Sequence, residues 1–402
     1  MKILIMCDLF DENIGSQENI LVKYFRKHGH QVTIFTSTYE SVFDFIANRH
    51  DATKPGMVYY IDDLKVIRAQ FRMNLLHKLR SYRGVKEAIK EVAPDMIFML
   101  DIMPDMLEVV RYKKRNPHVR FVMDYHADYS NSGKNWASIK ILHGVLRKFI
   151  LYRGLPYLDA IYPVTPGSGD FLNEVYGVSW DQMTLLPLGA DMDSGIEIAR
   201  REEGRALRKE LGIAPETKVI FSGGKFAKLK RTELLIEAVR RLPHQPIELV
   251  IVGAANIGEE EYAAMLREVA GDDPRIHFVG WQDNAGLFRF MDMADLAIFP
   301  ASQSSLWVQA VSMGLPLVVG NFGAQDTSYM NAHDNIIELS RDEIRADRLA
   351  EIIEELVSDP ERLASMAAGA RRTFEEVLDW DTLVGKVTGQ SESTSRIERA
   401  SA

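Results

Sequence analysis

Short runs of apolar, often β-branched residues recur along the chain, and each is followed by a longer segment with the hydrophobic period of a helix. In segment 18–28, for example, Ile20, Leu21, Tyr24 and Phe25 fall on one helical face. Strands that are apolar throughout and alternate with such helices are typical of parallel sheets covered on both faces, so we predict an α/β fold. The expected strands are 3–7, 32–35, 96–100, 121–123 and 160–164 in the first half, and 219–222, 248–252, 276–279, 296–299 and 317–319 in the second.

The alternating pattern starts afresh near Val219, after a polar and charged stretch. This restart predicts two Rossmann-like domains in tandem, for which a chain of 402 residues is long enough. We expect one domain over 1–190 and a second over 191–378. A C-terminal helix is expected within 379–402, and the small polar residues that follow it are expected to be disordered.

The chain carries a net charge of −9, which is unevenly placed: residues 1–190 hold 24 basic and 21 acidic side chains, and the remainder holds 24 and 36. Halves of opposite sign suggest different partners, and an acidic total argues against binding nucleic acid. No apolar run approaches the ~20 residues of a membrane span, and the N-terminus lacks the pattern of a secretory signal. The single Cys7 excludes an internal disulfide and a cysteine-based zinc site. A soluble, cytoplasmic protein is expected.

In each half, the first strand leads into a glycine-bearing loop and then a helix; the first loop holds Gly15 and Ser16, the second Gly223 and Gly224. Glycine lets the backbone approach a ligand closely, and a helix N-terminus offers free N–H groups to an anion. Neither loop matches a Walker P-loop or G-x-G-x-x-G, so ATP and NAD are not favoured. A basic turn that merely faces solvent is the alternative for the second loop. Its cations are Lys225, Lys228, Lys230 and Arg231.

A third anion site is expected where strand 296–299 gives way to a helix near Ser304 or Ser305. Serine is a favourable N-cap, and the free amides beyond it point toward the carboxyl end of the strand, where α/β proteins bind ligands. An ordinary N-cap without a ligand is the alternative.

Together these segments resemble the GT-B glycosyltransferases, in particular the GT4 (glycosyltransferase group 1) family. The likeness covers almost the whole chain and is strongest over 219–316. Gly224, Lys225, Lys230 and the segment 234–238 stand in the register of the family's donor loop, with lysine at 225 instead of the usual arginine. Further matches lie at 250–253, 278–281, 294–295, 299–300 and 310–319, and in the first half at 15–18, 29–32, 94–95 and 188–191.

The resemblance implies two Rossmann-like domains facing each other across a cleft, the first for the acceptor and the second for the donor, with the C-terminal helix packing back on the first. It implies transfer of a sugar, with retention, from a UDP- or GDP-sugar to a glycan or lipid-linked acceptor, in the synthesis of cell-surface polysaccharide or glycolipid. No cofactor and no metal are expected, because basic side chains and helix amides carry the diphosphate charge. Two Asp-x-Asp segments, 191–193 and 379–381, match the motif of metal-dependent transferases, but they fall on a linker and a C-terminal helix.

The sequence departs from the family at its pair of glutamates, which are separated by seven residues. The second, which holds the donor ribose, falls on Gln309, and the first falls on Ala301, or on Gln303 if two residues are deleted. Since neither position supplies a carboxylate, the contact to the transferred sugar is open. The alternatives are a nucleotide-sugar-binding module without turnover and an epimerase or hydrolase of the same fold.

In the scheme that the resemblance implies, Lys225 and Lys230 are catalytic, because they stabilise the departing diphosphate. Helix amides share that charge, Gln309 holds the ribose, and the backbone after strand 276–279 meets the base. The expected donor-binding residues are Gly15, Ser16, Gly224, Gly253, Trp281, Gln282, Gln303, Ser304, Ser305, Leu306 and Gln309.

The segment after strand 121–123 carries His126, flanked by Asp124 and Asp128. In the family, a histidine here approaches the donor sugar. We expect His126 to bind a sugar hydroxyl, while Asp124 or Asp128 orients it or accepts the proton of the acceptor; His126 and Asp128 are the expected catalytic residues of this half. A loop histidine with structural partners is the alternative.

Two stretches that are both basic and apolar, 68–83 and 134–153, occur in the first half. Amphipathic helices of this kind can lie on anionic lipid, which predicts a peripheral contact with the inner face of the cell membrane and fits a lipid-linked acceptor. The alternative is that both apolar faces belong to the core.

Overall fold

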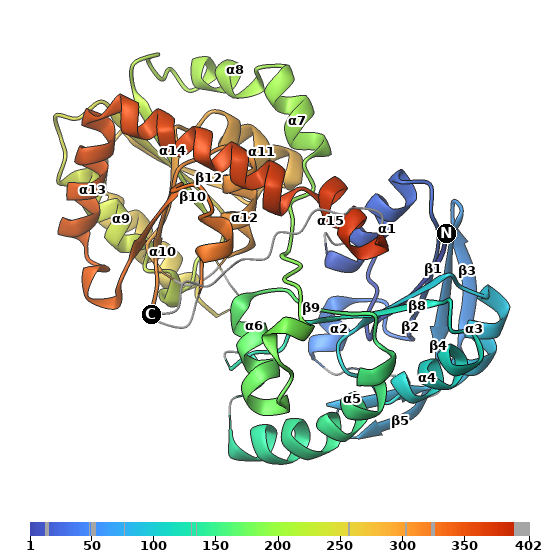
Figure 1. Cartoon of the computed structure of the whole chain (residues 1–402). Coiled ribbons are helices and arrows are strands. Elements are labelled where there is room, and N and C mark those ends of the chain that lie inside the picture. Colours follow the sequence, from blue (N-terminus) through green and yellow to red (C-terminus); the bar gives the residue numbers. More distant parts are fainter. Residues whose placement is uncertain are drawn as a thin grey trace. The chain divides into compact units, whose positions relative to one another are not determined.

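The computed structural model describes residues 1–12, 16–47, 49, 54–75, 77–129, 131–133, 135–255, 258–301, 304–322 and 326–389. Two compact units emerge from its contacts. The first unit is Met1–Leu188 together with the described residues from Leu383 onward, and the second unit is Gly189–Thr382. Each unit is a sheet covered by helices, as the prediction of an α/β fold requires (Figure 1).

A seven-stranded sheet forms the centre of the first unit, in the order β3-β4-β2-β1-β7-β8-β9. All neighbouring strands are parallel except β3 and β4. The inner strands β1 and β7 are buried almost throughout, as expected of parallel strands covered on both faces. The strands are β1 (Lys2–Met6), β2 (Gln31–Ser37), β3 (Met57–Ile61), β4 (Leu64–Ala69), β7 (Met96–Leu100), β8 (Arg120–Tyr125) and β9 (Ala160–Pro163).

The prediction of an amphipathic helix over 68–83 is wrong. The segment holds the end of β4 and an antiparallel hairpin of β5 (Phe71–Leu75) and β6 (Leu79–Tyr82). Burial alternates along β4, where Leu64 and Val66 face the core, and this period of two belongs to a strand.

Arg68 shows why this basic stretch is core. Its side chain is buried at the end of β4, and its guanidinium donates to the carbonyl oxygens of Phe10, Ser37 and Tyr39. Backbone carbonyls from two loops thus satisfy the buried cation, as a buried charge requires.

The helices of the first unit cover both faces of its sheet. α1 (Gln17–Lys27) buries Leu21, Tyr24 and Phe25 of the predicted face and leaves Ile20 half-exposed. Among the described residues, every helix is too short or too polar to cross a bilayer. The others are α2 (Val42–Ile46), α3 (Val85–Val92), α4 (Met106–Arg115), the π-helix η1 (Ser138–Arg147), α5 (Lys148–Gly154), η2 (Leu155–Tyr157), α6 (Pro166–Phe171), η3 (Leu172–Tyr176) and η4 (Trp180–Gln182).

The sheet of the second unit has six parallel strands in the order β12-β11-β10-β13-β14-β15. All five expected strands are present, and the short edge strand β15 (Ile336–Leu339) was not predicted. The five are β10 (Lys218–Gly223), β11 (Ile247–Val252), β12 (Ile276–Gly280), β13 (Leu296–Phe299) and β14 (Leu317–Gly320).

Helices also surround the second sheet, and the polar stretch before it forms two of them, α7 and α8. Arg208 of α8 pairs with Asp295 at 2.6 Å, which anchors this stretch to the second unit. The helices are α7 (Asp193–Arg200), α8 (Glu203–Glu210), η5 (Lys228–Lys230), α9 (Thr232–Arg240), α10 (Glu260–Ala270), α11 (Asn284–Asp292), α12 (Ser305–Ser312), η6 (Ser328–Met330), η7 (Arg341–Glu343), α13 (Ala346–Ser358), α14 (Pro360–Thr373) and η8 (Phe374–Leu378).

The last helix, α15 (Trp380–Thr388), passes from the second unit into the first. Arg120 Nε of β8 donates to the carbonyl oxygen of Val387 at 2.9 Å, and the hydroxyl of Tyr162 in β9 donates to that of Lys386 at 3.3 Å. These bonds join the end of the helix to the first sheet. The units therefore divide after residues 188 and 382, where the sequence analysis placed the boundaries after 190 and 378.

Candidate active site

Three carboxylates mark the carboxyl ends of adjacent strands in the first unit. Asp8 follows β1, Asp101 follows β7, and Asp124 is the penultimate residue of β8. These strands are parallel neighbours, so the three residues share one edge of the sheet. Open α/β sheets bind their ligands at this edge.

The imidazole of His126 is bound to the carboxylate of Asp124. The distance from His126 Nε2 to Asp124 Oδ2 is 3.0 Å, and Gln17 of α1 donates from its own Nε2 to the same oxygen at 3.2 Å. Asp124 is fully buried, which raises the pKa of its carboxyl. Burial opposes protonation of His126, but the carboxylate beside it prevails and raises the pKa of the imidazole to about 9. At neutral pH the ring is therefore an imidazolium.

The start of α1 adjoins this pair. Ser16 caps the helix in an extended conformation, and its hydroxyl binds the carboxylate of Glu18. Burial raises the pKa of Glu18, which the Ser16 hydroxyl and the charge of His126 partly counteract. The bond from Gln17 thus brings the predicted residues Ser16 and His126 to one place; the predicted Gly15 lies outside the described residues.

Asp128 belongs to a tight turn next to His126. Its Oδ1 accepts from the backbone N–H of Asn131, and Asn131 Oδ1 accepts from the N–H of Asp128, both at 3.0 Å. The side-chain amide of Asn131 also donates to the carbonyl oxygen of His126 at 2.9 Å. Of the two aspartates that the sequence offered as partners, Asp124 is the one in contact with the ring.

Two further ion pairs at this edge were missed by the sequence analysis. Asp8 binds Arg80 at 2.9 Å and accepts a hydrogen bond from Tyr82. Asp101 binds Arg147 at 2.8 Å and has a left-handed backbone, with φ of 66°. The signal was present as a lone carboxylate directly after an apolar strand, but the arginines come from elements far along the chain.

In the second unit, the loops after β10 and β11 pack closely against each other. The N–H of Gly224 donates to the carbonyl oxygen of Val252 at 2.9 Å. A Cβ at Gly253 would lie 1.9 Å from the carbonyl oxygen of Gly224, so only glycine fits there. A Cβ at Gly224 would lie 3.9 Å from the Oγ of Ser304. The predicted residues Gly224, Gly253 and Ser304 therefore meet at the carboxyl edge of this sheet.

The basic loop presents its cations in different environments. Lys225 and Lys228 are exposed, whereas Lys230 is half-buried, and this burial lowers the pKa of its ammonium group. Arg231 pairs with Glu233 at 3.0 Å. A partly desolvated ammonium group such as that of Lys230 gains more from a bound anion than an exposed one, because less water screens the attraction.

The helix α12 begins next to this loop, as predicted. Ser304 is its N-cap, and the serine Oγ accepts from the N–H of Leu306 at 3.4 Å. Ser305, the first helical residue, is exposed, and the side chain of Leu306 is buried. The first turn therefore offers backbone N–H groups at the glycine loop.

The two positions of the family's glutamates differ in their surroundings. Gln309 lies one turn into α12, and its Oε1 is buried without a hydrogen-bond partner in the described part of the chain. Ala301 is fully buried in the hydrophobic core. Gln303 lies outside the described residues. An ungapped alignment therefore places the first motif position in the core, on a side chain with no exposed surface.

Trp281 and Gln282 follow β12 at the same edge. The N–H of Gly253 donates to the carbonyl oxygen of Gly280 at 2.9 Å, so the end of β12 adjoins the glycine loops. The indole of Trp281 is 64% exposed and offers a flat surface for a base. All described members of the predicted donor set except Ser16 thus lie in the second unit, at or beside one edge of its sheet.

The Asp-x-Asp segment 379–381 begins α15, where Asp379 Oδ1 accepts from the N–H of Asp381 at 3.1 Å. No three His, Cys, Asp or Glu side chains in the described ranges form a cluster fit to hold a metal ion.

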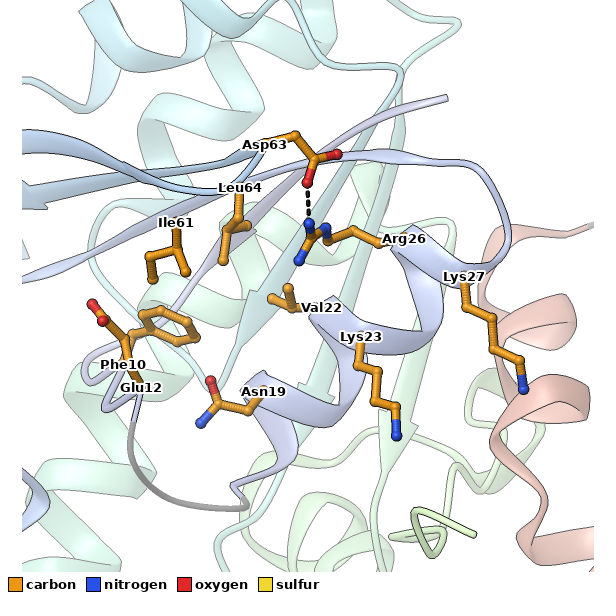
Figure 2. Close-up of a pocket in the computed structure, with 10 residues that line it drawn as sticks. All are labelled: Phe10, Glu12, Asn19, Val22, Lys23, Arg26, Lys27, Ile61, Asp63 and Leu64. Carbon is orange, nitrogen blue, oxygen red and sulfur yellow. Dashed lines mark hydrogen bonds and ion pairs between the residues drawn. The ribbon is translucent and has the colours of Figure 1, made fainter. Parts of the chain in front are cut away.

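A cavity of about 500 Å³ lies in the first unit between α1 and the connection of β3 to β4 (Figure 2). Arg26 and Asp63 form an ion pair there. None of the predicted site residues is among its described lining residues. Those are Phe10, Glu12, Asn19, Val22, Lys23, Arg26, Lys27, Ile61, Asp63 and Leu64.

Comparison with protein families identifies both halves of the chain. The family described as Glycosyl transferases group 1 matches residues 204–373, and the one described as Glycosyltransferase Family 4 matches residues 20–194. The two matched regions fall largely into the second and the first unit, respectively.

Individual curated relatives share about a quarter of their aligned residues with this chain. The GDP-mannose-dependent monoacylated alpha-(1-6)-phosphatidylinositol monomannoside mannosyltransferase of Corynebacterium glutamicum is 25% identical over 268 residues, which are 58% of this chain and 68% of the relative. The D-inositol 3-phosphate glycosyltransferase of Jonesia denitrificans is 25% identical over 223 residues, 52% of this chain and 51% of the relative. The chain thus spans about half the length of the second relative.

Solved structures match almost the entire chain. HepE of Anabaena in complex with UDP has a TM-score of 0.66 at 16% identity, with 97% of this chain and 99% of that chain covered. WaaG, a glycosyltransferase of lipopolysaccharide biosynthesis, has a TM-score of 0.59 at 15% identity, with 96% and 100% covered. At such identities the likeness establishes the fold, which is GT-B with two Rossmann-like domains.

Proposed function

Because this chain belongs to the GT4 family of GT-B glycosyltransferases, we propose that it transfers a hexosyl group from a nucleoside diphosphate sugar to a glycan or lipid-linked acceptor. Retention of the anomeric configuration and a role in cell-surface polysaccharide or glycolipid synthesis are part of this proposal. So is a reaction that needs no metal or other cofactor.

The comparisons support a nucleotide-sugar donor and leave its base open. A curated relative is named for its use of GDP-mannose, and HepE was crystallised with UDP and with UDP-glucose. UDP and GDP are therefore the two nucleotides to test. The same relative acts on a phosphatidylinositol mannoside, which supports a lipid-linked acceptor.

The observation that carries the proposal is the meeting of three elements in the second unit. The glycine loop with Lys225 and Lys230, the tight turn at Gly253 and the N-terminus of α12 all lie at the ends of neighbouring parallel strands. Cations and free backbone N–H groups converge there, which is the arrangement that stabilises a diphosphate as it leaves a sugar. In this scheme Lys230 contributes most, because it is partly desolvated.

In the first unit, the contact between His126 and Asp124 decides which atom of the ring is available. Nε2 is engaged by the carboxylate, so Nδ1 is the ring nitrogen that we assign to a substrate. With its pKa raised to about 9, the ring donates a hydrogen bond from Nδ1 at neutral pH. We assign this donor to a hydroxyl group of the transferred sugar. Because a protonated imidazole cannot accept a proton, we assign the removal of the acceptor's proton to the departing phosphate.

One observation favours a second candidate, a nucleotide-sugar-binding module without turnover. Ala301 is buried and Gln309 is neutral, so neither described position of the family's glutamate pair supplies a carboxylate. Such a protein binds the donor but transfers nothing.

Calorimetry with UDP and with GDP tests the nucleotide site and identifies the base. Release of nucleotide from the matching sugar nucleotide is then followed with and without acceptor. Release that depends on acceptor supports a transferase, and release without acceptor indicates a hydrolase. Binding with no release indicates the module, whereas absence of binding to both nucleotides refutes the proposed site.

A further inference from the structure

The helix formed by η1 and α5 turns a large apolar face outward. Trp136 is 69% exposed, Val145 59% and Phe149 54%, and Ile141 and Tyr152 are also exposed. Their spacings of five, four, four and three residues bring them to one side of a helix that is π-wound over Ser138–Arg147. The interpretation of this stretch as core is therefore wrong for this side of the helix.

The opposite side of the helix fixes its orientation. His143 is buried, and its Nδ1 is 2.6 Å from the hydroxyl of Tyr176. Ile150 and Leu151 are buried in the core of the first unit. Arg147 binds Asp101 at 2.8 Å and donates to the carbonyl oxygen of Lys78 at 3.0 Å. The inner side of the helix is thus fixed to the first unit by apolar packing and by polar bonds. The outer side carries large exposed side chains.

The charged side chains along this helix have one sign. Between residues 129 and 158 the chain has five Lys or Arg residues and no Asp or Glu. The guanidinium of Arg153 lies 4.4 Å from the centre of the Phe149 ring, and the ammonium of Lys148 lies 5.6 Å from that of Tyr152. Lys140 is exposed one residue before Ile141. Cations beside exposed aromatic rings suit the boundary between acyl chains and anionic head groups.

We propose that this face, formed by Trp136, Ile141, Val145, Phe149 and Tyr152 with their flanking cations, is the surface by which the protein binds an anionic lipid bilayer. A second copy of the chain is disfavoured as occupant, because a twofold contact through this face would bring like charges together. The inference extends the proposed function, in which the acceptor is linked to a lipid. Lipid binding is measured without donor or acceptor, so its test is independent of the test of transfer.

The turn between β5 and β6 is joined to the inner side of this helix by the bond from Arg147 to the carbonyl oxygen of Lys78. Leu75 near its tip is exposed, and so is Lys78. Arg147 is unsuitable for a test, since its change would also break the pair with Asp101.

The test is co-sedimentation of the full chain at low salt with phosphatidylcholine vesicles, with and without phosphatidylglycerol. We expect binding only when the anionic lipid is present. The variant Lys140→Glu/Arg153→Glu, which changes two exposed cations, should bind at least about tenfold more weakly, because it replaces attraction to the anionic surface by repulsion. The variant Val145→Ser/Phe149→Ser should also lose binding to the vesicles. Added salt should weaken the binding of the wild-type protein to anionic vesicles.

Matched controls come from the second unit. Lys209→Glu/Arg372→Glu makes the same change of charge at exposed positions, and Ile196→Ser/Leu211→Ser removes exposed apolar side chains. Both controls should bind as the wild type does. All variants should keep the melting temperature and nucleotide affinity of the wild type, because the altered side chains are exposed and lie outside the donor site.

A wild type that does not bind anionic vesicles overturns the proposal, as does binding that survives both changes to this face. Dimerisation lost in the same variants, without lipid binding, would assign the face to a second copy instead. Failure to bind UDP and GDP would refute the proposed donor site and leave the lipid result untouched.

Discussion

The two units present their chemistry in opposite ways. In the first, the polar groups at the carboxyl edge of the sheet are bound to one another: Asp124 to His126 and Gln17, and Asp101 to Arg147. In the second, the corresponding edge offers backbone N–H groups and cations beside glycine, of which Lys225 is exposed. The first edge is already organised by its own ion pairs, whereas the second has an excess of positive charge that an anion would balance.

This difference predicts different responses to mutation. Removing a cation from the second edge should act on the donor directly, through lost charge stabilisation. Altering a pair at the first edge should act through the remaining partner, whose position and protonation change. Effects of the second kind depend on pH.

The largest effect is expected at Lys230. Lys230→Ala should lower transfer by about 10²-fold or more, which is the loss seen when a group that stabilises developing charge is removed. Initial rates at saturating donor measure this. Lys228→Ala, in the same turn but exposed, is the matched control and should cost far less. Equal losses in the two variants would show that the effect is one of net charge and not of the partly buried position.

Asp124→Asn should lower kcat/KM by about 10- to 100-fold, because a hydrogen bond to a charged group contributes about 1.5–3 kcal/mol. It should also lower the pKa of His126 from about 9, so the alkaline limb of the pH–rate profile should move to lower pH. Asp128→Asn is the control, since that carboxylate closes a turn. A profile that stays in place in Asp124→Asn would mean that His126 does not titrate in the reaction.

The same pair should make stability depend on pH. The pKa of His126 is raised from 6.5 to about 9 on folding, so its contribution is complete below pH 6.5 and is lost as the pH rises through about 9. The difference in free energy of unfolding between the wild type and His126→Gln should therefore shrink over this range. Urea unfolding at several pH values measures it, and a difference that grows with pH would contradict the assignment.

Gly253→Ala should separate backbone geometry from charge at the second edge. The added Cβ would collide with the carbonyl oxygen of Gly224, so the loop must shift, and we expect nucleotide affinity to fall by about tenfold, the cost of misplacing one or two hydrogen bonds. Gly212→Ala is the control, because Gly212 also has a positive φ but open space around it. Unchanged affinity in Gly253→Ala would show that this turn does not shape the nucleotide site.

The smallest effect is expected at Gln309. Gln309→Ala should weaken nucleotide binding only a few-fold, because a neutral hydrogen bond contributes about 0.5–1.5 kcal/mol. Gln309→Glu restores the family's carboxylate and should leave affinity equal or better. Calorimetry with UDP and GDP checks both variants. A loss in Gln309→Glu as large as in Gln309→Ala would argue against a contact to the ribose.

Much of the fold could be read from the sequence, because continuous apolar runs such as those at β1 and β7 are compatible with little except buried parallel strands. The positions of the glycine loop after β10 and of the N-cap Ser304 also followed, since both depend on local signals: glycine after a strand and serine before a helix. In contrast, 68–83 was misread as helix. Its basic and apolar residues suggested an amphipathic helix on anionic lipid, whereas the cation of Arg68 is buried against carbonyl oxygens contributed by distant loops.

The sequence by itself therefore determined the two α/β halves and the residues that follow their strands, because periodicity and capping act over a few neighbouring positions. Only the tertiary structure decided that Gln17 and Asp124 share a hydrogen bond across 107 positions of the chain, and that Glu18 and Asp101 lie near enough to His126 to support the rise in its pKa that Asp124 causes. It also decided which side of the helix at Ser138–Gly154 is covered. An amphipathic pattern marks two faces of a helix, but burial depends on what the rest of the chain places against each of them.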